Sequence, residues 1–174
     1  MHLRQLRPDE GLAYRDVRLR SLREAPEAFA STFEEESTQP DAFWLDLVDR
    51  TAEAMGSAIL TVERDDGTLA ATTYVRVAPD PPHDAYIGAM WLDADLRGPR
   101  ETPDGPGWAD QLLAAAEHFA RTLGSQSIEL WVSESNPRAQ RFYQRNGYRP
   151  TGLTEPQPSG ITAHHLVKPL AAGS

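Results

Sequence analysis

The sequence contains no cysteine. That absence excludes disulfide scaffolds, cysteine nucleophiles and zinc sites with cysteine ligands, so any acyl group handled here is not carried on a thiol of the protein. No stretch approaches the roughly 18 apolar residues of a membrane span, and the first residues, MHLRQLRPDE, lack the apolar segment of a secretory signal. We therefore expect a cytoplasmic protein that does not insert into a membrane.

Positive charge is also scarce. The 17 Lys and Arg residues are outnumbered by 26 Asp and Glu residues, which leaves a net charge of −9 at pH 7. A surface of that sign repels nucleic-acid phosphates and attracts cations. The composition therefore argues against a nucleic-acid partner and favours a cationic ligand.

Common catalytic and nucleotide-binding motifs are missing: the sequence has no G-x-x-x-x-G-K-[ST], no G-x-G-x-x-G after a strand, and no G-x-S-x-G. The histidines, His2, His83, His118, His164 and His165, include no pair at the i, i+4 spacing of a helical zinc site. The neighbours His164 and His165 point to opposite faces of a strand and would not share a metal. We predict no metal site, and surface or packing roles for these histidines.

The pattern of apolar and turn residues predicts one mixed α/β domain, which a chain of 174 residues suits. It predicts, in order, a strand near Leu3 and Leu6, a helix that ends before Pro26, a helix over 40–54, a hairpin over 58–77 turned at Asp66-Gly67, a strand over 85–92, a helix over 107–123, a strand over 128–132, a helix over 137–147 and a strand over 161–167. We divide the domain, residues 1–174, into an N-terminal strand with two lid helices (1–56), the central strands with the following helix (57–123), and a C-terminal strand-helix-strand unit (124–170).

The most specific motif lies in the run IELWVSESNPRAQRFYQRNGY, residues 128–148. An apolar strand is followed by an Asn-Pro helix start, an aromatic pair and a Gly-aromatic end. This arrangement resembles the strand and helix that close the cofactor site of the GCN5-related N-acetyltransferase (GNAT) family, N-x-x-A-x-x-F-Y-x-x-x-G-[FY]. The matching residues are Asn136, Ala139, Phe142, Tyr143, Gly147 and Tyr148. Each also suits a structural role as cap, core aromatic or helix stop, and the two roles do not compete.

The resemblance implies a single-domain GNAT fold of the α/β (α+β) class, with a mixed central sheet of about six to seven strands flanked by about four helices. It implies an N-acetyltransferase that transfers an acetyl group from acetyl-CoA (coenzyme A) to a primary amine by direct attack, without a metal. The acidic charge favours a small cationic amine over a peptide as acceptor. The alternative is an acyl-CoA-binding module with little or no catalysis. Family members are often dimers, so a homodimer is an open expectation.

The loop that binds the pyrophosphate of coenzyme A departs from the family pattern, [QR]-x-x-G-x-[GA]. Here the loop, residues 98–106, is longer by about seven residues, and Asp104 stands where the pattern has Gln or Arg. Arg97 and Arg100 remain available to neutralise phosphate. We assign to this part of the site Arg97, Gly98, Gly107, Trp108 and Ala109. The departure predicts a weakened affinity for the cofactor.

The resemblance also assigns the reactive end of the cofactor site. The strand backbone around Met90 and Leu92 would hold the pantetheine arm and polarise the thioester carbonyl. Asn136 and Phe142 would contact the same cofactor, and Tyr143 would protonate the leaving thiolate. A tyrosine pKa near 10 against a thiol pKa near 8.5 makes that transfer about 2 kcal/mol uphill, which is tolerable if it is concerted with C–S cleavage.

The general base is the least determined residue. Family members often carry a glutamate four residues before the position of Leu92, and this sequence has Gly88 there. Our first candidates for the base and for the acceptor site lie on the expected lid, where charge beside aromatic rings suits an organic cation: Phe33, Glu34, Glu35 and Trp44, with Glu34 as the base. Glu129 and Asp93 come second. The run of glutamates at 34–36 equally suits a solvated helix face, so both interpretations stay open.

Overall fold

The computed structural model describes residues 1–80, 84–98, 101–102, 105–157 and 160–170. Its centre is a seven-stranded sheet in the order β1-β2-β3-β4-β7-β9-β8. The strands are β1 (His2–Gln5), β2 (Ser57–Glu63), β3 (Leu69–Val77), β4 (Ala85–Leu92), β7 (Ser127–Ser133), β8 (Arg149–Pro156) and β9 (Thr162–Pro169), with β5 (Glu101–Thr102) and β6 (Gly105–Pro106) as a separate ribbon. The helices are α1 (Gly11–Glu24), α2 (Phe33–Ser37), α3 (Asp41–Glu53), α4 (Trp108–Thr122) and α5 (Pro137–Arg145), with short 3₁₀ turns η1 (Pro8–Glu10), η2 (Pro26–Ala28) and η3 (Ala94–Leu96).

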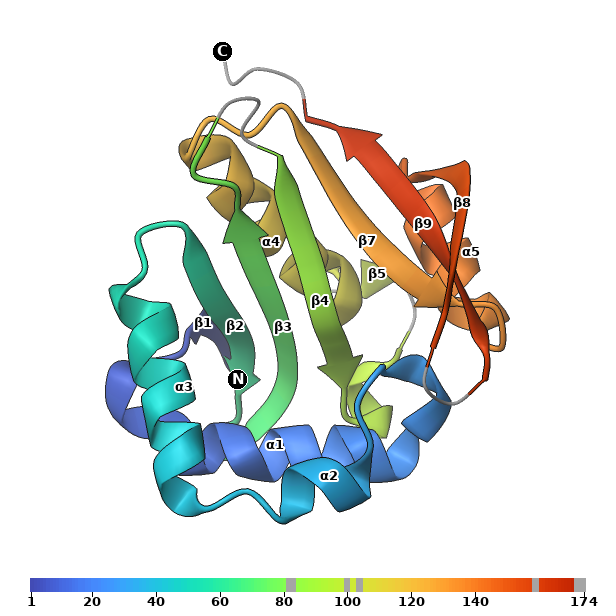
Figure 1. Ribbon diagram of the computed structural model, residues 1–174. Helices are drawn as coiled ribbons and strands as arrows, with labels where there is room; N and C mark the ends of the chain where they lie inside the picture. Colours follow the sequence, from blue (N-terminus) through green and yellow to red (C-terminus); the bar gives the residue numbers. More distant parts are fainter. Residues whose placement is uncertain (81–83, 99–100, 103–104, 158–159, 171–174) are drawn as a thin grey trace.

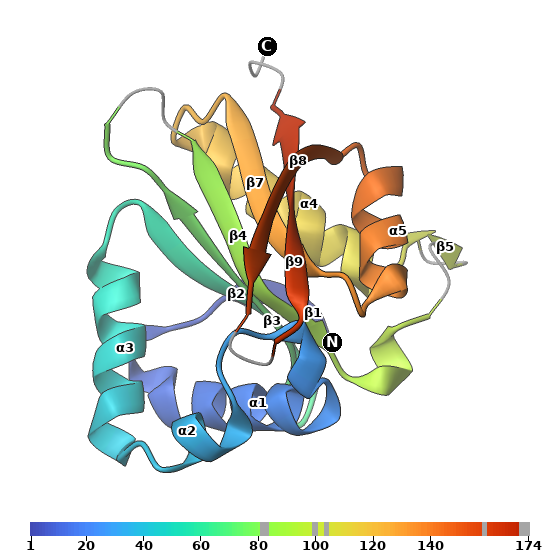
Figure 2. The ribbon, with the colours of Figure 1, turned by 45° about the vertical axis from the view of Figure 1, so that its right-hand side comes forward.

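Helices cover both faces of the sheet (Figures 1 and 2). On one face Leu112 of α4 belongs to the same core cluster as Leu60 of β2. On the other face Val17 of α1 and Trp44 of α3 pack with Ile59. Because successive strand residues point to opposite faces, the neighbours Ile59 and Leu60 serve two different cores. The fold class expected from the sequence is confirmed: one mixed sheet lies between two layers of helices.

The strand β8 was absent from the sequence prediction. All of its residues are exposed, it has a proline near each end, and Gly152 has a φ of 88°. It is the edge strand beside β9. An edge strand with no buried face lacks the apolar alternation that predicts the other strands of the sheet. The prediction also omitted α2, whose five residues are too few for a helical period.

The sheet opens between its two central strands. β4 and β7 are parallel and pair at Ala85 with Ile128 and at Tyr86 with Glu129, after which the two ribbons diverge (Figure 1). The divergence begins at a bulge in β4, where the register against β3 shifts and Ala89 takes a φ of 52°. A bulge adds one unpaired residue and bends its strand. The opening therefore exposes the backbone of β4 in the middle of the sheet.

A buried carboxylate fixes the helix layer behind this opening. Glu117 of α4 is 5% exposed. It accepts hydrogen bonds from Nζ of Lys168 at 2.7 and 2.8 Å, from Oη of Tyr148 at 3.2 Å and from Arg121 at 3.1 Å. A buried carboxylate is costly unless its oxygens are paired, so these bonds hold α4 against β9 and the fully buried Tyr148.

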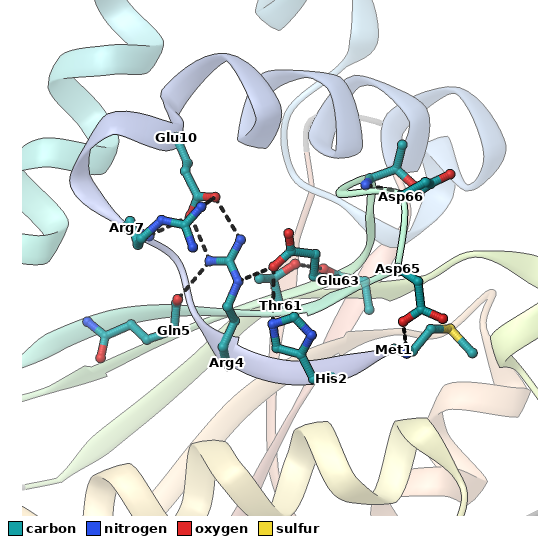
Figure 3. A network of polar contacts seen from close by, with 12 residues as sticks. Met1, His2, Arg4, Gln5, Arg7, Glu10, Thr61, Glu63, Asp65 and Asp66 are labelled. Carbon is teal, nitrogen blue, oxygen red and sulfur yellow. Dashed lines mark hydrogen bonds and ion pairs between the residues drawn. The ribbon is translucent and has the colours of Figure 1, made fainter.

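A second polar cluster ties the first strand to the sheet (Figure 3). The guanidinium of Arg4 donates two hydrogen bonds of 2.7 Å to Glu10 and one of 2.5 Å to Glu63. Arg7 also binds Glu10, through its backbone N–H at 2.7 Å and its guanidinium at 2.6 Å. Burial raises the pKa of Glu10, but the bonds from Arg4 and Arg7 overcome that effect and hold the pKa below its usual value.

Neither a membrane-spanning helix nor a cluster of metal-ligating side chains occurs among the described residues. No helix among them combines the length and apolar content that crossing a membrane requires. Nor does that part of the chain gather three or more His, Cys, Asp or Glu side chains in a way that could hold a metal ion.

The Arg4 cluster should make stability depend on pH. Because the pKa of Glu10 is lower in the folded state than its unfolded value near 4.3, its contribution is complete above that pH and is lost as pH falls through the folded pKa. We expect Glu10→Gln to cost about 1–2 kcal/mol at pH 7 and much less at pH 3, as measured by urea unfolding at both pH values. The neighbouring change Asp9→Asn, at a side chain 83% exposed, should cost less than about 0.5 kcal/mol at either pH. Equal losses for Glu10→Gln at both pH values would contradict this account.

Candidate functional site

A cavity of about 470 Å³ opens between the end of β4, the start of α4 and the inner side of α5. We call it the α4–α5 cavity. Every residue that the sequence analysis assigned to the cofactor lines it: Met90, Leu92, Arg97, Gly98, Gly107, Trp108, Ala109, Asn136, Phe142 and Tyr143. Residues 24–25 and 27–29, from the end of α1 through η2 to Phe29, supply much of the remaining wall. The tertiary structure thus brings together residues from four separate stretches of the chain.

The α4–α5 cavity is lined by three arginines and by three carboxylates, Glu24, Glu27 and Asp110. The arginines are Arg97, Arg138 and Arg145. Arg97 is fixed by a 2.7 Å bond from its Nε to the carbonyl oxygen of Leu92 and by a 3.0 Å ion pair with Glu24. Arg138 and Arg145 were not predicted. The available signal was the i, i+4, i+7 spacing of Arg138, Phe142 and Arg145, which places all three on one side of α5.

The amino terminus of α4 also favours an anion. Gly107 is its N-cap and no side chain caps the helix. The first N–H groups of a helix and its dipole favour an anion at that end. The lengthened loop contains the β5–β6 ribbon, in which Glu101 pairs with Pro106 and Thr102 with Gly105, so part of the extra length forms a small excursion ahead of the helix. The expected roles of Arg100 and Asp104 fall on positions outside the described residues.

Tyr143 lies where this cavity meets the rest of the site. It is 9% exposed and its hydroxyl donates to Sδ of Met90 at 3.6 Å. Burial, with a smaller contribution from Tyr86, raises the pKa of Tyr143 well above its ordinary value. The hydroxyl therefore stays protonated and can act as a donor throughout the neutral and alkaline range.

A small cavity of about 60 Å³ follows the opening between β4 and β7. We call it the junction cavity. It shares Met90, Asn136 and Tyr143 with the α4–α5 cavity, and Gly88 and Trp131 with the space on the other side of the sheet. Among the described residues that line it, none carries a charged side chain. Apolar surroundings of this kind favour the neutral form of a titratable group.

Two larger cavities lie on the far side of the junction. The β8 cavity, of about 480 Å³, is lined by Phe29, Tyr86 and Trp131 together with Glu27 and Glu155. The α3 cavity, of about 400 Å³, is lined by aromatic and acidic residues of the α2–α3 region, among them Phe43, Trp44 and Glu35. Both cavities reach Gly88 and Ala89. The bulge in β4 is thus common to all the space on this face.

The predicted lid residues occupy different places. Glu34 is exposed and lines none of the cavities found among the described residues, so the structure lends no support to its predicted role as a base. Phe33 lies under the guanidinium of Arg23, 4.2 Å from the ring centroid. Glu35 lines the α3 cavity, but its carboxylate accepts the backbone N–H of Thr32 at 2.9 Å and caps α2. Trp44 is buried and lines the same cavity.

The second-choice carboxylates are engaged elsewhere. Glu129 binds Nε2 of His165 at 3.1 Å, and Asp93 binds Arg64 at 3.1 Å. At Gly88, a Cβ would lie 2.8 Å from Cε1 of Tyr86. A glutamate at position 88 would therefore require that ring to move.

The chain is similar in sequence to known proteins. The model of the acetyltransferase (GNAT) family matches residues 19–148. A blasticidin-S acetyltransferase from Streptomyces morookaense is 38% identical over 89 residues, which are 49% of this chain and 57% of that protein. The chain thus matches little more than half of this relative's length.

Solved structures share the fold over nearly the whole chain. A GNAT-family acetyltransferase from Streptococcus pneumoniae has a TM-score of 0.81 and 14% identity, with 98% of this chain and 99% of that chain covered. A protein from Salmonella typhimurium, solved with acetyl-CoA, has a TM-score of 0.75 and 13% identity, with 100% and 96% covered. At these identities the likeness establishes the fold.

The bulge at Ala89 generates a stability prediction. A φ of 52° strains any residue with a Cβ and most of all a β-branched one. We expect Ala89→Gly to leave the melting temperature unchanged or raise it, and Ala89→Val to cost about 1–3 kcal/mol, or roughly 2–10 °C by differential scanning calorimetry. If valine proved as stable as glycine here, the left-handed backbone at this position would be wrong.

Proposed function

The chain belongs to the acetyltransferase (GNAT) family, and we propose on that basis that it transfers an acetyl group from acetyl-CoA to a primary amine of a small cationic molecule. The observation that carries the proposal is a row of adjoining cavities at the opening of the sheet: the α4–α5 cavity and the junction cavity share Tyr143, and the junction cavity and the β8 cavity share Trp131. A donor and an acceptor could meet there from opposite sides of the opening.

The residues of the α4–α5 cavity fit coenzyme A. The uncapped start of α4 and the arginines suit its phosphates. The β4 backbone at Met90 and Leu92 borders the cavity at the bulge, where its polar groups suit an extended amide chain. When bound, the cofactor supplies an activated acetyl group as a thioester.

Tyr143 fits the role of proton donor to the departing sulfur. In the proposed step the neutral amine attacks the carbonyl carbon, a C–N bond forms and the C–S bond breaks. Tyr143 would give its hydroxyl proton to sulfur, the surplus proton on nitrogen would leave to water on the β8 side, and a proton from solvent would return to the Tyr143 oxygen before the next turnover. The buried hydroxyl is a weak acid, so its proton transfer has to accompany C–S cleavage.

The junction cavity offers a way to deprotonate the amine without a carboxylate base. A lysine-like amine of pKa near 10.4 costs about 4.6 kcal/mol to deprotonate at pH 7. A lining without charged groups, among the residues described, disfavours the ammonium form and lowers the pKa of an amine that enters. We propose that entry into this cavity assists deprotonation, with the proton released to solvent, in place of the glutamates expected on the lid.

The rival function is an acyl-CoA-binding module with little catalysis. It draws support from Gly88 at the position where the family often has glutamate, and from the lengthened loop. The buried donor Tyr143 at the meeting point of the cavities favours the enzyme, because a binding module has no need of a proton donor there. We further propose a cytoplasmic location and leave the homodimer as an expectation.

Thiol release tests the two functions directly. With acetyl-CoA and a panel of amines that includes blasticidin S, chosen for the name of the Streptomyces relative, we expect coenzyme A thiol to appear with at least one cationic amine. Mass spectrometry should find that amine heavier by one acetyl group. Thermal stabilisation by acetyl-CoA without thiol release over the whole panel would favour the binding module.

Tyr143→Phe tests the proton donor. We expect kcat to fall by about 10²- to 10⁴-fold, while the Kd for acetyl-CoA from calorimetry changes by less than about threefold, because the ring still fills the cavity wall. Tyr148→Phe is the matched control. Its hydroxyl binds Glu117 behind the sheet and Tyr148 lines none of the cavities formed by described residues, so stability should fall by about 1 kcal/mol with kcat retained. Unchanged kcat in Tyr143→Phe would remove Tyr143 as the acid.

A further inference from the structure

The β8 cavity has a rigid aromatic wall. The ring of Trp131 lies 4.9 Å from that of His165, centroid to centroid. His165 is buried and both of its ring nitrogens have partners: Nδ1 contacts Oγ1 of Thr151 at 2.9 Å and Nε2 contacts Glu129 at 3.1 Å. The histidine is therefore held by both of its ring nitrogens, and as the cross-strand partner of Trp131 it packs against the indole. A flat ligand could stack on Trp131 at little cost in side-chain ordering.

The outer part of the same cavity is acidic. Glu27, from η2, and Glu155, from β8, line it, and Glu27 also lines the α4–α5 cavity. Both are exposed, and neither carboxylate has a hydrogen-bond or ion-pair partner among the described residues. Arg18 also lines the cavity, but Glu36 binds its guanidinium at 2.7 and 3.0 Å and offsets its charge. The cavity thus offers two unpaired negative charges beside an aromatic surface.

The β8 cavity shares more of its lining with the junction cavity than the α3 cavity does. The junction cavity and the β8 cavity share Phe29, Trp131 and Ser133 as well as the bulge residues. The α3 cavity shares only Gly88 and Ala89 with the junction cavity among the described lining residues. An acceptor with its amine in the junction cavity therefore has the rest of its body in the β8 cavity.

The charges are separated from the place where the amine reacts. The reacting nitrogen must be neutral, and the junction cavity that would receive it has no charged side chain among its described lining residues. Glu27 and Glu155 line the β8 cavity and are absent from the described lining of the junction cavity, so they would attract a second positive group on the same molecule. Stacking on Trp131 and a cation–π contact favour a flat cation.

We propose that the acceptor is a primary amine joined to a second, flat cationic group such as an amidinium or guanidinium, which stacks on Trp131 and is selected by Glu155 and Glu27. This inference rests on the proposed function. It moves the acceptor site from the lid, where the sequence analysis looked for it, to the cavity between η2 and β8.

A matched pair of probes separates charge from shape: 4-(aminomethyl)benzamidine and 4-(aminomethyl)benzamide carry the same primary amine on the same ring, and only the first has the second cation. With the unmodified protein we expect kcat/KM to favour the benzamidine by about three- to tenfold. Glu155→Gln should remove most of that preference by raising KM for the benzamidine, with kcat and the benzamide unchanged.

Substitutions at Trp131 test the aromatic wall, and a substitution at Glu53 is the control. Trp131→Leu should raise KM for both probes, and Trp131→Phe, which retains an aromatic face, should restore part of the loss. Glu53→Gln, an exposed residue of α3 outside all of the cavities lined by described residues, should alter nothing. The proposal would be overturned if the preference for the benzamidine survived both Glu155→Gln and the double variant Glu155→Gln/Glu27→Gln. It would also be overturned if the preference were lost instead in Glu35→Gln, in the α3 cavity.

A binding measurement distinguishes this failure from that of the proposed function. Calorimetric titration of the benzamidine into protein saturated with coenzyme A requires no turnover. Weaker binding in Glu155→Gln would support the cation site even if no amine released thiol. Thiol release with both probes at equal kcat/KM, together with equal binding in the unmodified and Glu155→Gln proteins, would sustain the acetyltransferase and refute the cation site.

Discussion

The rest of the site depends on one constraint of the sheet: β4 and β7 pair over two residues and then diverge. The divergence follows from the bulge in β4, which the bond from Oγ1 of Thr73 to the carbonyl of Gly88, 3.2 Å long, helps to hold. Closed ladders bury their backbone groups in pairs. Here the pairing is interrupted in the middle of the sheet, so strand backbone becomes available to a ligand and cavities adjoin one another at the opening.

Among the described lining residues, the charged side chains lie on both sides of this opening and not at its middle. Three arginines line the α4–α5 cavity together with Glu24, Glu27 and Asp110, and the β8 cavity is lined by Glu27, Glu155 and the paired Arg18. The junction cavity between them has no charged residue in its described lining, and such surroundings suit a reaction between neutral groups. The buried hydroxyl of Tyr143 lies at that middle.

An opened sheet needs support from behind, because the two halves share few direct strand contacts. The Glu117 cluster supplies part of it by linking α4, Tyr148 and β9 through a buried carboxylate. On the other face Arg18 joins α1 to α2 through Glu36. Arg18 and Glu36 line cavities, whereas Glu117 and Tyr148 line none of those formed by described residues and serve packing.

The sequence by itself determined the fold class and most of the strands and helices, because these depend on local periodicity, and its resemblance to the family pointed to ten residues that line the α4–α5 cavity. It missed Arg138, Arg145 and the wall from residues 24–25 and 27–29. It did not find β8, whose exposed residues carry no apolar pattern, nor the cavity that Glu155 and Glu27 share. It placed the acceptor near Glu34 because acidic and aromatic residues are adjacent there in sequence. Only the tertiary structure shows the β8 cavity, on which the proposed acceptor site rests, because its lining residues Glu27 and Glu155 come from η2 and β8, more than a hundred residues apart in the chain.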